Sequence, residues 1–289
     1  RAEMLGELMR FRFGIAISGT HGKTTTTSLI VHIMSEAKLD PTYIIGGIIN
    51  ATGMNAKLGK SDYLIAEADE SDASFLHLQP MLSVITNIDE DHMSTYNHNY
   101  DNLIDAFVSF TSNLPFYGVC VACIDDNGVK DILKKIHRPV LSYGFSDDAD
   151  VKATNVKQSE MKMSFDVTCK KYQKKFPVSL NLMGRHNILN SLAAISVAIE
   201  LDIELKVIQK ALSHFSGVSR RLDYHQNLIV NTHLVPLFDD YGHHPNEITE
   251  VVSTLRNTYP DKRLMVIFQP HRYSRTRDLF NDFVSCLSK

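Results

Sequence analysis

The sequence predicts an α/β fold with a mostly parallel sheet. This prediction rests on three features of the sequence. Short apolar runs of strand length alternate with longer segments of helical periodicity through the first half of the chain. Glycine-rich or acidic segments directly follow several apolar runs, as loops do at the carboxyl ends of parallel strands. A polar, charged segment over 219–227 separates this unit from a second alternation of strand and helix. We therefore expect an α/β domain over 1–222 and the start of a Rossmann-like α/β domain over 223–289.

The elements expected in the first domain follow from this periodicity. Buried strands are predicted by apolar runs over 13–18, 63–68, 82–87, 119–124 and 140–143. Helices are predicted over 24–38, 99–112, 129–136, 187–200 and 205–215. The stretch 149–182 has little helical periodicity and predicts a small additional β region.

The second domain is expected to begin with a strand over 235–239 and a helix that Pro245 opens. Apolar residues recur in this helix at i, i+3, i+4 and i+7: Ile248, Val251, Val252 and Leu255. A further strand is predicted over 264–268, and a last helix has Ser274 as a plausible N-cap. Because the amphipathic pattern of this last helix still continues at Lys289, we expect the chain to be a piece of a longer protein.

Composition excludes several classes of protein. Lys and Arg number 30 against 33 Asp and Glu, a net charge of −3, whereas nucleic-acid binders usually carry a basic excess. No apolar run reaches the ~18 residues that a membrane-spanning helix needs. Cys120 and Cys123 have metal-site spacing but lie in an apolar run without a second pair, so we expect buried strand cysteines. The four cysteines in the chain fit a reducing compartment, and we expect a cytoplasmic protein.

The strongest motif is a candidate phosphate-binding loop between the first predicted strand and the first predicted helix. It comprises Gly19, Thr20, His21, Gly22, Lys23, Thr24 and Thr25. Glycines let the backbone approach a phosphate, Lys23 can neutralise phosphate oxygens, and the Thr24 hydroxyl can hold Mg²⁺. The spacing is unusual, because the common pattern would require a glycine at Ile17. The alternative is an ordinary glycine-rich turn, but threonines are poor helix formers and four of them follow the lysine.

Acidic residues follow the next two predicted strands of the sheet. Glu67 opens one acidic stretch, and Asp91 and His92 lie in another. Ligands collect at the carboxyl ends of strands in such sheets, so a carboxylate there can reach a Mg²⁺ held by Thr24. Glu67 alone fits a solvated acidic loop equally well. The repetition at three successive strand ends favours Thr24, Glu67 and His92 as metal ligands.

Amides and cationic side chains mark further candidate binding positions. Asn187 and Asn190 lie three residues apart on a helix, so both amides can face one adenine edge, although a cap and a packing residue explain them equally well. Arg221 lies at the expected domain boundary, where a guanidinium can clamp a phosphoryl group. The segments 239–245 and 269–277 follow the strands of the second domain with cationic and aromatic residues, which suggests a pocket for a small anionic substrate.

Taken together, these segments resemble the Mur ligases of peptidoglycan synthesis. The resemblance rests on the loop 19–25, on 67–75, on Asp91-His92, on His186-Asn187 with Asn190, on Arg220-Arg221, on 239–245 and on 268–277. It implies that Gly19 to Thr25 bind the phosphates of ATP, with Lys23 in contact with them, and that Thr24 and Glu67 hold one Mg²⁺ while His92 helps to hold a second. It implies that Asn187 and Asn190 contact adenine, Asp240 the ribose and Arg221 the γ-phosphate. It assigns the amino-acid end of the site to Tyr241, His243, His271, Arg272 and Arg275.

The resemblance also implies a reaction. ATP would drive the joining of L-alanine to UDP-N-acetylmuramic acid through an acyl phosphate, with Lys23, Glu67, His92 and Arg221 as the catalytic residues. One alternative is a murein-peptide ligase, which adds a tripeptide to the same nucleotide sugar. Another is a non-catalytic switch that binds ATP and signals by domain movement.

Overall fold

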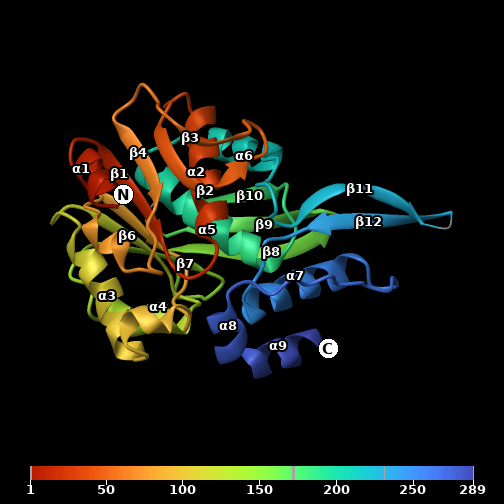
Figure 1. Cartoon of the computed structure of the whole chain (residues 1–289). Coiled ribbons are helices and arrows are strands. Elements are labelled where there is room, and N and C mark those ends of the chain that lie inside the picture. Colours follow the sequence, from red (N-terminus) through yellow and green to blue (C-terminus); the bar gives the residue numbers. More distant parts are fainter. Residues whose placement is uncertain (1, 171–172, 231, 289) are drawn as a thin grey trace.

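A computed structural model describes residues 2–170, 173–230 and 232–288 (Figure 1). The main feature of these described residues is a large sheet with the strand order β10-β9-β8-β7-β6-β5-β1-β4-β2-β3. The central strands are parallel: β1 (Phe13–Ser18), β4 (Tyr63–Glu67), β5 (Leu82–Ile85), β6 (Val119–Cys123) and β7 (Val140–Gly144). These strands confirm the predicted buried runs, and Cys120 and Cys123 are buried in β6 as expected.

Strands at both ends extend this parallel centre. β2 (Thr42–Ile49) pairs parallel with β4, and β3 (Met54–Lys57) pairs antiparallel with β2. On the other side, β8 (Val151–Ser159), β9 (Lys162–Cys169) and β10 (Lys174–Leu180) form an antiparallel extension that joins the sheet at β7. The small additional β region is therefore confirmed as part of the same sheet.

Helices cover both faces of the sheet (Figure 1). One apolar cluster joins the sheet to α2 (Lys23–Glu36), α5 (Arg185–Glu200) and α6 (Leu205–His214). The other joins it to α1 (Ala2–Met9), α3 (Tyr100–Ser112), α4 (Asn127–Leu133) and the short 3-10 helices η1 (Ser74–His77) and η2 (Met93–Tyr96). Successive side chains of β1 point to opposite faces of the sheet, so the strand contributes to both clusters. Ile15 and Ile17 pack in the first cluster and Ala16 packs in the second.

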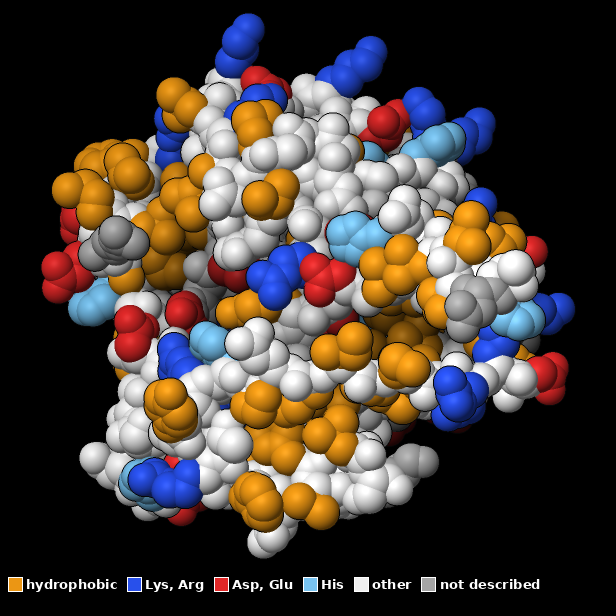
Figure 2. Space-filling model, turned by 45° about the vertical axis from the view of Figure 1, so that its right-hand side comes forward, with side chains coloured by type: hydrophobic (Ala, Val, Ile, Leu, Met, Phe, Trp, Pro, Cys, Tyr) orange, Lys and Arg blue, Asp and Glu red, His pale blue; other side chains and the backbone are white. Residues whose placement is uncertain are grey.

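The second unit is smaller and less buried. β11 (Asp223–Val230) and β12 (His233–Asp239) form a two-stranded antiparallel hairpin that projects from the body, and α7 (Pro245–Thr258), α8 (Tyr273–Asp278) and α9 (Phe280–Leu287) follow it (Figure 1). Hydrophobic side chains gather on the surface of this unit, beside the hairpin and the last helices (Figure 2). Ile229, Met265 and Ile267 are among the most exposed of them.

Two predictions for the second unit are wrong. The predicted strand over 264–268 has no regular structure, because a strand needs a neighbour for its backbone hydrogen bonds and β12 pairs only with β11 in the described chain. Ser274 lies inside α8, and Arg272 occupies the N-cap position with a φ of 68°. The helix begins earlier than predicted, so the Ser274 hydroxyl does not cap it.

The periodicity analysis did not predict α1, β2, β3 or β11. β2 contains Gly46 and Gly47, which are usually rare inside strands. None of the described helices is both long enough and apolar enough to cross a membrane.

Candidate active site

The predicted phosphate loop joins β1 to the N-terminus of α2. Gly22 takes the N-cap position of α2 with a φ of 83°, a left-handed conformation that favours glycine. A Cβ at Gly22 would lie 2.5 Å from the Asn190 Oδ1 atom, so only a glycine lets the loop approach α5 this closely. The His21 N–H donates to Asn87 Oδ1 at 2.7 Å, which fixes the backbone of the loop against the end of β5. The first N–H groups of an α-helix have no acceptor within the helix, so those at the start of α2 can meet an anion, as such a loop requires.

Lys23, the first residue of α2, folds its side chain back over the loop. Its Nζ atom donates to the Gly19 and Thr20 carbonyls and to the carboxylate of Glu70, which is 2.7 Å away. Glu70 is buried, and its carboxylate lies within the acidic stretch that follows β4. Sequence reasoning singled out Glu67 in that stretch and missed Glu70.

Thr24 and Glu67, two of the predicted metal ligands, lie together. The Thr24 hydroxyl donates to Glu67 Oε2 at 3.3 Å, and the Gly46 N–H donates to Glu67 Oε1 at 2.7 Å. Burial raises the pKa of the Glu67 carboxyl, and the Gly46 N–H and the Lys23 charge oppose that shift. Oxygen donors of this kind are the ones that Mg²⁺ prefers, so the pair fits the predicted cation.

His92, the third predicted ligand, contacts the second unit. Its Nδ1 atom lies 3.2 Å from Arg272 Nη1, and its Nε2 atom lies 3.3 Å from Asp91 Oδ2. Arg275 is buried and pairs with Asp91 at 3.0 Å. The structure thus brings His92 together with Arg272 and Arg275, which were predicted at the amino-acid end of the site. A metal at His92 stays a prediction.

A cavity of about 360 Å³ lies beside the phosphate loop and between the two units. Its wall includes seven residues predicted to bind ATP: His21, Gly22, Thr25, Asn187, Asn190, Arg221 and Asp240. Residues that sequence reasoning did not single out also line it, among them Asp89, Asp125, Tyr143, Leu189 and Glu247. No single motif marks these residues, because they come from two loops, from β7 and from the helices α5 and α7.

The two predicted adenine residues also make internal hydrogen bonds. Asn187 donates to the Met183 carbonyl at 2.8 Å, and Asn190 donates to Asn187 Oδ1 at 3.1 Å. Thr26 Oγ1 donates to Asn190 Oδ1 at 3.3 Å. Both amides are buried at the cavity wall, so packing and nucleotide contact are compatible roles for them.

Asp240, the predicted ribose residue, closes the turn after β12. Its carboxylate accepts the Leu222 N–H at 2.7 Å and the Gly242 N–H at 2.6 Å. Burial raises the pKa of Asp240, and these two N–H groups oppose that shift.

The predicted substrate residues of the 239–245 segment form an aromatic group with His271. The ring centroids of Tyr241 and His243 are 5.0 Å apart, and those of His243 and His271 are 5.7 Å apart. The Arg221 guanidinium lies 5.6 Å from the Tyr241 ring centre, which connects this group to the wall of the cavity.

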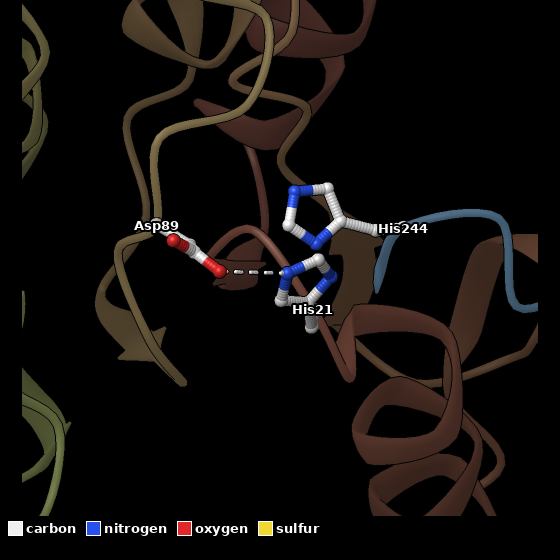
Figure 3. A group of neighbouring side chains, drawn as sticks. All are labelled: His21, Asp89 and His244. Carbon is white, nitrogen blue, oxygen red and sulfur yellow. Dashed lines mark hydrogen bonds and ion pairs between the residues drawn. The ribbon is translucent and has the colours of Figure 1, made fainter. Parts of the chain in front are cut away.

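His21 of the loop bridges two carboxylates, and Figure 3 shows its contact with the first of them, Asp89. Its Nε2 atom lies 3.4 Å from Asp89 Oδ2, and its Nδ1 atom lies 3.3 Å from Oε1 of Glu247 on α7. Arg221 lies 3.7 Å from the same Glu247 oxygen. Burial alone would lower the pKa of His21, but the bonds and charges of Asp89 and Glu247 outweigh it and raise the pKa to about 9. Sequence reasoning missed Asp89 and Glu247.

His21, Asp89 and His244 are also close enough to surround a metal ion, since their ligand atoms lie within 4.8 Å of one another (Figure 3). The His244 Nε2 atom is buried without a hydrogen-bond partner among the described residues. Both ring nitrogens of His21, however, already face carboxylates, and its raised pKa keeps protons on them. We therefore assign this group to the hydrogen-bond network between the units rather than to a metal centre.

Together the fold and the site define an α/β protein that presents a phosphate loop beside a second unit. The chain belongs to the Mur ligase family: the Mur ligase middle domain matches residues 17–198, and the Mur ligase glutamate ligase domain matches residues 220–289. This confirms the family that the motifs predicted.

Proteins named UDP-N-acetylmuramate–L-alanine ligase are similar to the chain along its length. Those of Ruthia magnifica subsp. Calyptogena magnifica and Hydrogenovibrio crunogenus are 68% identical over 288 residues and 56% identical over 287 residues. The match to the Ruthia magnifica protein covers 100% of this chain and 61% of that relative. The match to the Hydrogenovibrio crunogenus protein covers 99% of this chain and 62% of that relative.

Solved structures support the same fold. The UDP-N-acetylmuramate-alanine ligase of Thermotoga maritima matches 96% of this chain and 61% of its own chain, with a TM-score of 0.80 and 26% identity. A murein peptide ligase of Psychrobacter arcticus matches 94% of this chain and 60% of its own, with a TM-score of 0.74 and 25% identity. The predicted α/β fold is thereby confirmed.

The His21 bridge predicts a pH dependence of stability. A pKa raised from 6.5 to about 9 on folding stabilises the protein fully below pH 6.5, and this contribution is lost as the pH rises through 9. We expect the free energy of unfolding, measured with urea, to fall by on the order of 2 kcal/mol between these pH values. His21→Asn should remove this part of the slope. Equal slopes in both proteins would contradict the bridge.

The close approach of Gly47 to Thr24 predicts a steric requirement beside the Thr24–Glu67 pair. A Cβ at this position would lie 2.7 Å from the Thr24 Cγ2 atom. Gly47→Ala should therefore push Thr24 away from Glu67 and destabilise the fold by about 1–3 kcal/mol in urea unfolding. Ile48→Ala, at the exposed neighbouring position, is the control. An unchanged stability for Gly47→Ala would mean that β2 does not approach the loop this closely.

Proposed function

We propose that the protein to which this chain belongs is an ATP-dependent carboxylate–amine ligase that joins UDP-N-acetylmuramic acid to L-alanine. The observation that carries the proposal is the meeting of Lys23 with Glu70, in the loop after β4, and of Thr24 with Glu67, the last residue of β4, at 3.3 Å. A phosphate loop next to paired oxygen ligands suits a magnesium-bound triphosphate. The names of the 68% and 56% identical relatives support the choice of substrates.

In this proposal the nucleotide extends from the loop into the cavity. The triphosphate lies against residues 19–25 at the N-terminus of α2, where Lys23 neutralises its charge. Adenine lies against Asn187 and Asn190, the ribose near Asp240, and Arg221 contacts the γ-phosphate. The cavity wall already contains these last four residues, which supports the placement.

Magnesium would be held by Thr24 and Glu67, and His92 would help to hold a second ion. When bound, Mg²⁺ neutralises charge on the phosphoryl group. Glu67 would remain ionised in this role despite its burial, since a cation and the Gly46 N–H both favour the carboxylate.

The reaction has two steps. A carboxylate oxygen of UDP-N-acetylmuramic acid attacks the γ-phosphorus, the bond to the leaving ADP oxygen breaks, and an acyl phosphate forms. The amine nitrogen of L-alanine then attacks the acyl carbon, the amine loses a proton, and inorganic phosphate leaves as the amide forms. Lys23 and Arg221 offset the negative charge of the transferring group. The group of Tyr241, His243, His271, Arg272 and Arg275 would hold the alanine.

The proposed reaction consumes ATP and a nucleotide-activated sugar, and we place it in the cytoplasm. The low cysteine content, four in 289 residues, fits a reducing compartment. We propose no nucleic-acid or membrane partner, in line with the net charge of −3.

Lys23→Ala tests the role of the loop. In the full-length enzyme, the loss of this cation should lower alanine-dependent phosphate release at least about a hundredfold, because one preorganised charge contact is typically worth that much. Lys60→Ala, on the exposed turn before β4, is the control. If Lys23→Ala turned over at the wild-type rate, the loop would have no part in the mechanism.

A substrate competition distinguishes the two ligase candidates. The murein peptide ligase of Psychrobacter arcticus is similar to this chain in structure, so the acceptor needs a direct test. With UDP-N-acetylmuramic acid and ATP present, we expect L-alanine to be consumed in preference to the tripeptide L-alanyl-γ-D-glutamyl-meso-diaminopimelate, as measured by chromatography of the products. Preferred use of the tripeptide would favour the murein-peptide ligase. ATP binding without phosphate release on addition of either acceptor would favour a non-catalytic switch.

A further inference from the structure

Glu70 is a buried acid that the proposed reaction does not use. It lies three residues after Glu67 in the loop that follows β4 and is 2% exposed. Its Oε2 atom is 2.7 Å from the Nζ atom of Lys23. An acid buried this deeply is costly without a partner, and Lys23 is the partner that it contacts.

The contacts of the Lys23 ammonium show what Glu70 contributes. An ammonium has three N–H donors, and the structure gives Lys23 three acceptors: the Gly19 carbonyl at 2.6 Å, the Thr20 carbonyl at 3.3 Å and Glu70. The two carbonyls belong to the phosphate loop itself and precede Lys23 by four and three residues. Glu70 comes from a different strand end, 47 residues away in sequence.

The backbone around Glu70 is held firmly. Its carbonyl accepts the hydroxyl of the buried Tyr96 and, at 3.0 Å, the N–H of Ala73. The carboxylate therefore has a fixed place beside the loop, where burial raises the pKa of Glu70 and the charge and hydrogen bond of Lys23 oppose that shift. It is not a flexible side chain that happens to meet the lysine.

We propose that Glu70 is a positioning residue for Lys23, whose ammonium it holds in the phosphate loop until a phosphate oxygen takes its place. This inference rests on the proposed function of the loop in binding ATP. All three N–H donors of Lys23 already have acceptors, so an incoming phosphate must replace one of them. Glu70 is the acceptor that can be replaced without moving the loop, because the two carbonyls are part of the loop backbone.

The exchange has a consequence for affinity and turnover. Phosphate competes with the Glu70 carboxylate for the same ammonium, so neutralising Glu70 should make nucleotide bind more tightly. The lysine would then be held less precisely during phosphoryl transfer, so turnover should fall. A purely structural Glu70 predicts the opposite result for binding, because loss of the ion pair would disturb the loop and weaken the binding of nucleotide.

The test is calorimetric titration of the full-length ligase with Mg²⁺ and ADP, which avoids turnover. Glu70→Gln keeps the size of the side chain and one acceptor oxygen but removes the charge. Its Kd for ADP should fall about three- to tenfold, the difference between a charged and a neutral hydrogen-bond acceptor. Its kcat for phosphate release should fall in the same protein. Adenosine, which has no phosphate, should bind equally well to the wild type and the variant.

Asp72→Asn is the matched control. Asp72 belongs to the same acidic stretch, is exposed, and accepts the Ser74 N–H at 2.9 Å, a bond that an asparagine oxygen also accepts. This variant removes the same charge without touching Lys23, so its Kd should stay within about twofold of the wild type. Equal tightening in both variants would assign the effect to general charge and overturn the proposal.

The remaining outcomes also decide the question. Unchanged or weaker ADP binding by a folded Glu70→Gln, next to normal binding by the wild type, would overturn the role of Glu70 alone. If Glu70→Gln does not fold, Glu70→Asp replaces it: the shorter side chain holds Lys23 less closely, and ADP should still bind more tightly than to the wild type. If the wild type itself bound no ADP, the proposed function would fail and this inference with it.

Discussion

The site depends on the meeting of a positively charged loop with the acids of the neighbouring strand. β1 and β4 are parallel and paired in a register that sets Ile17 opposite Glu67. This register places the loop after β1 beside the acidic stretch after β4, so that Lys23 reaches Glu70 and Thr24 reaches Glu67. The free N–H groups and dipole of α2 add positive charge at the same point. Each of these charges would be costly to bury without the others.

The second unit completes the site through polar contacts with the first. Glu247 at the start of α7 meets His21 of the loop, and Arg275 of α8 pairs with Asp91 at the end of another loop. Both contacts lie near the cavity or the predicted amino-acid site, and among the described residues neither apolar cluster extends into the second unit. Polar contacts of this kind are sensitive to pH and to small shifts between the units. If the proposed function holds, we expect nucleotide binding at this site to depend on how the second unit sits against the phosphate loop.

The sequence was sufficient to predict the parallel strands, α2, the loop between β1 and α2, and the meeting of Thr24 with Glu67, because local periodicity and the chemistry of strand ends determine them. It was not sufficient for Glu70, whose partner lies 47 residues away, or for Glu247, which lies 226 residues from His21. Thr24 and Glu67 are 43 residues apart, but Thr24 lies in a phosphate-loop motif and Glu67 lies at a predicted strand end. Nothing local distinguishes Glu70 from the other acids of its stretch, and Glu247 lies inside a predicted helix. The failure of the predicted strand over 264–268 has a similar cause, since apolar residues form a strand only where another strand offers hydrogen bonds. β2 was missed because its glycines suggest a loop, yet they permit close contact with Thr24 and Glu67.

We propose that one magnesium-bound triphosphate binds between the loop after β1 and the acids at and beyond the end of β4. A crystal structure of the full-length protein with Mn²⁺ and a non-hydrolysable ATP analogue tests it most directly, because the anomalous signal of manganese locates the ion. We expect manganese bound to Thr24 Oγ1 and the Glu67 carboxylate, with the triphosphate on the N–H groups at the start of α2. Manganese or triphosphate bound elsewhere, with Glu67 turned away from Thr24, would contradict it.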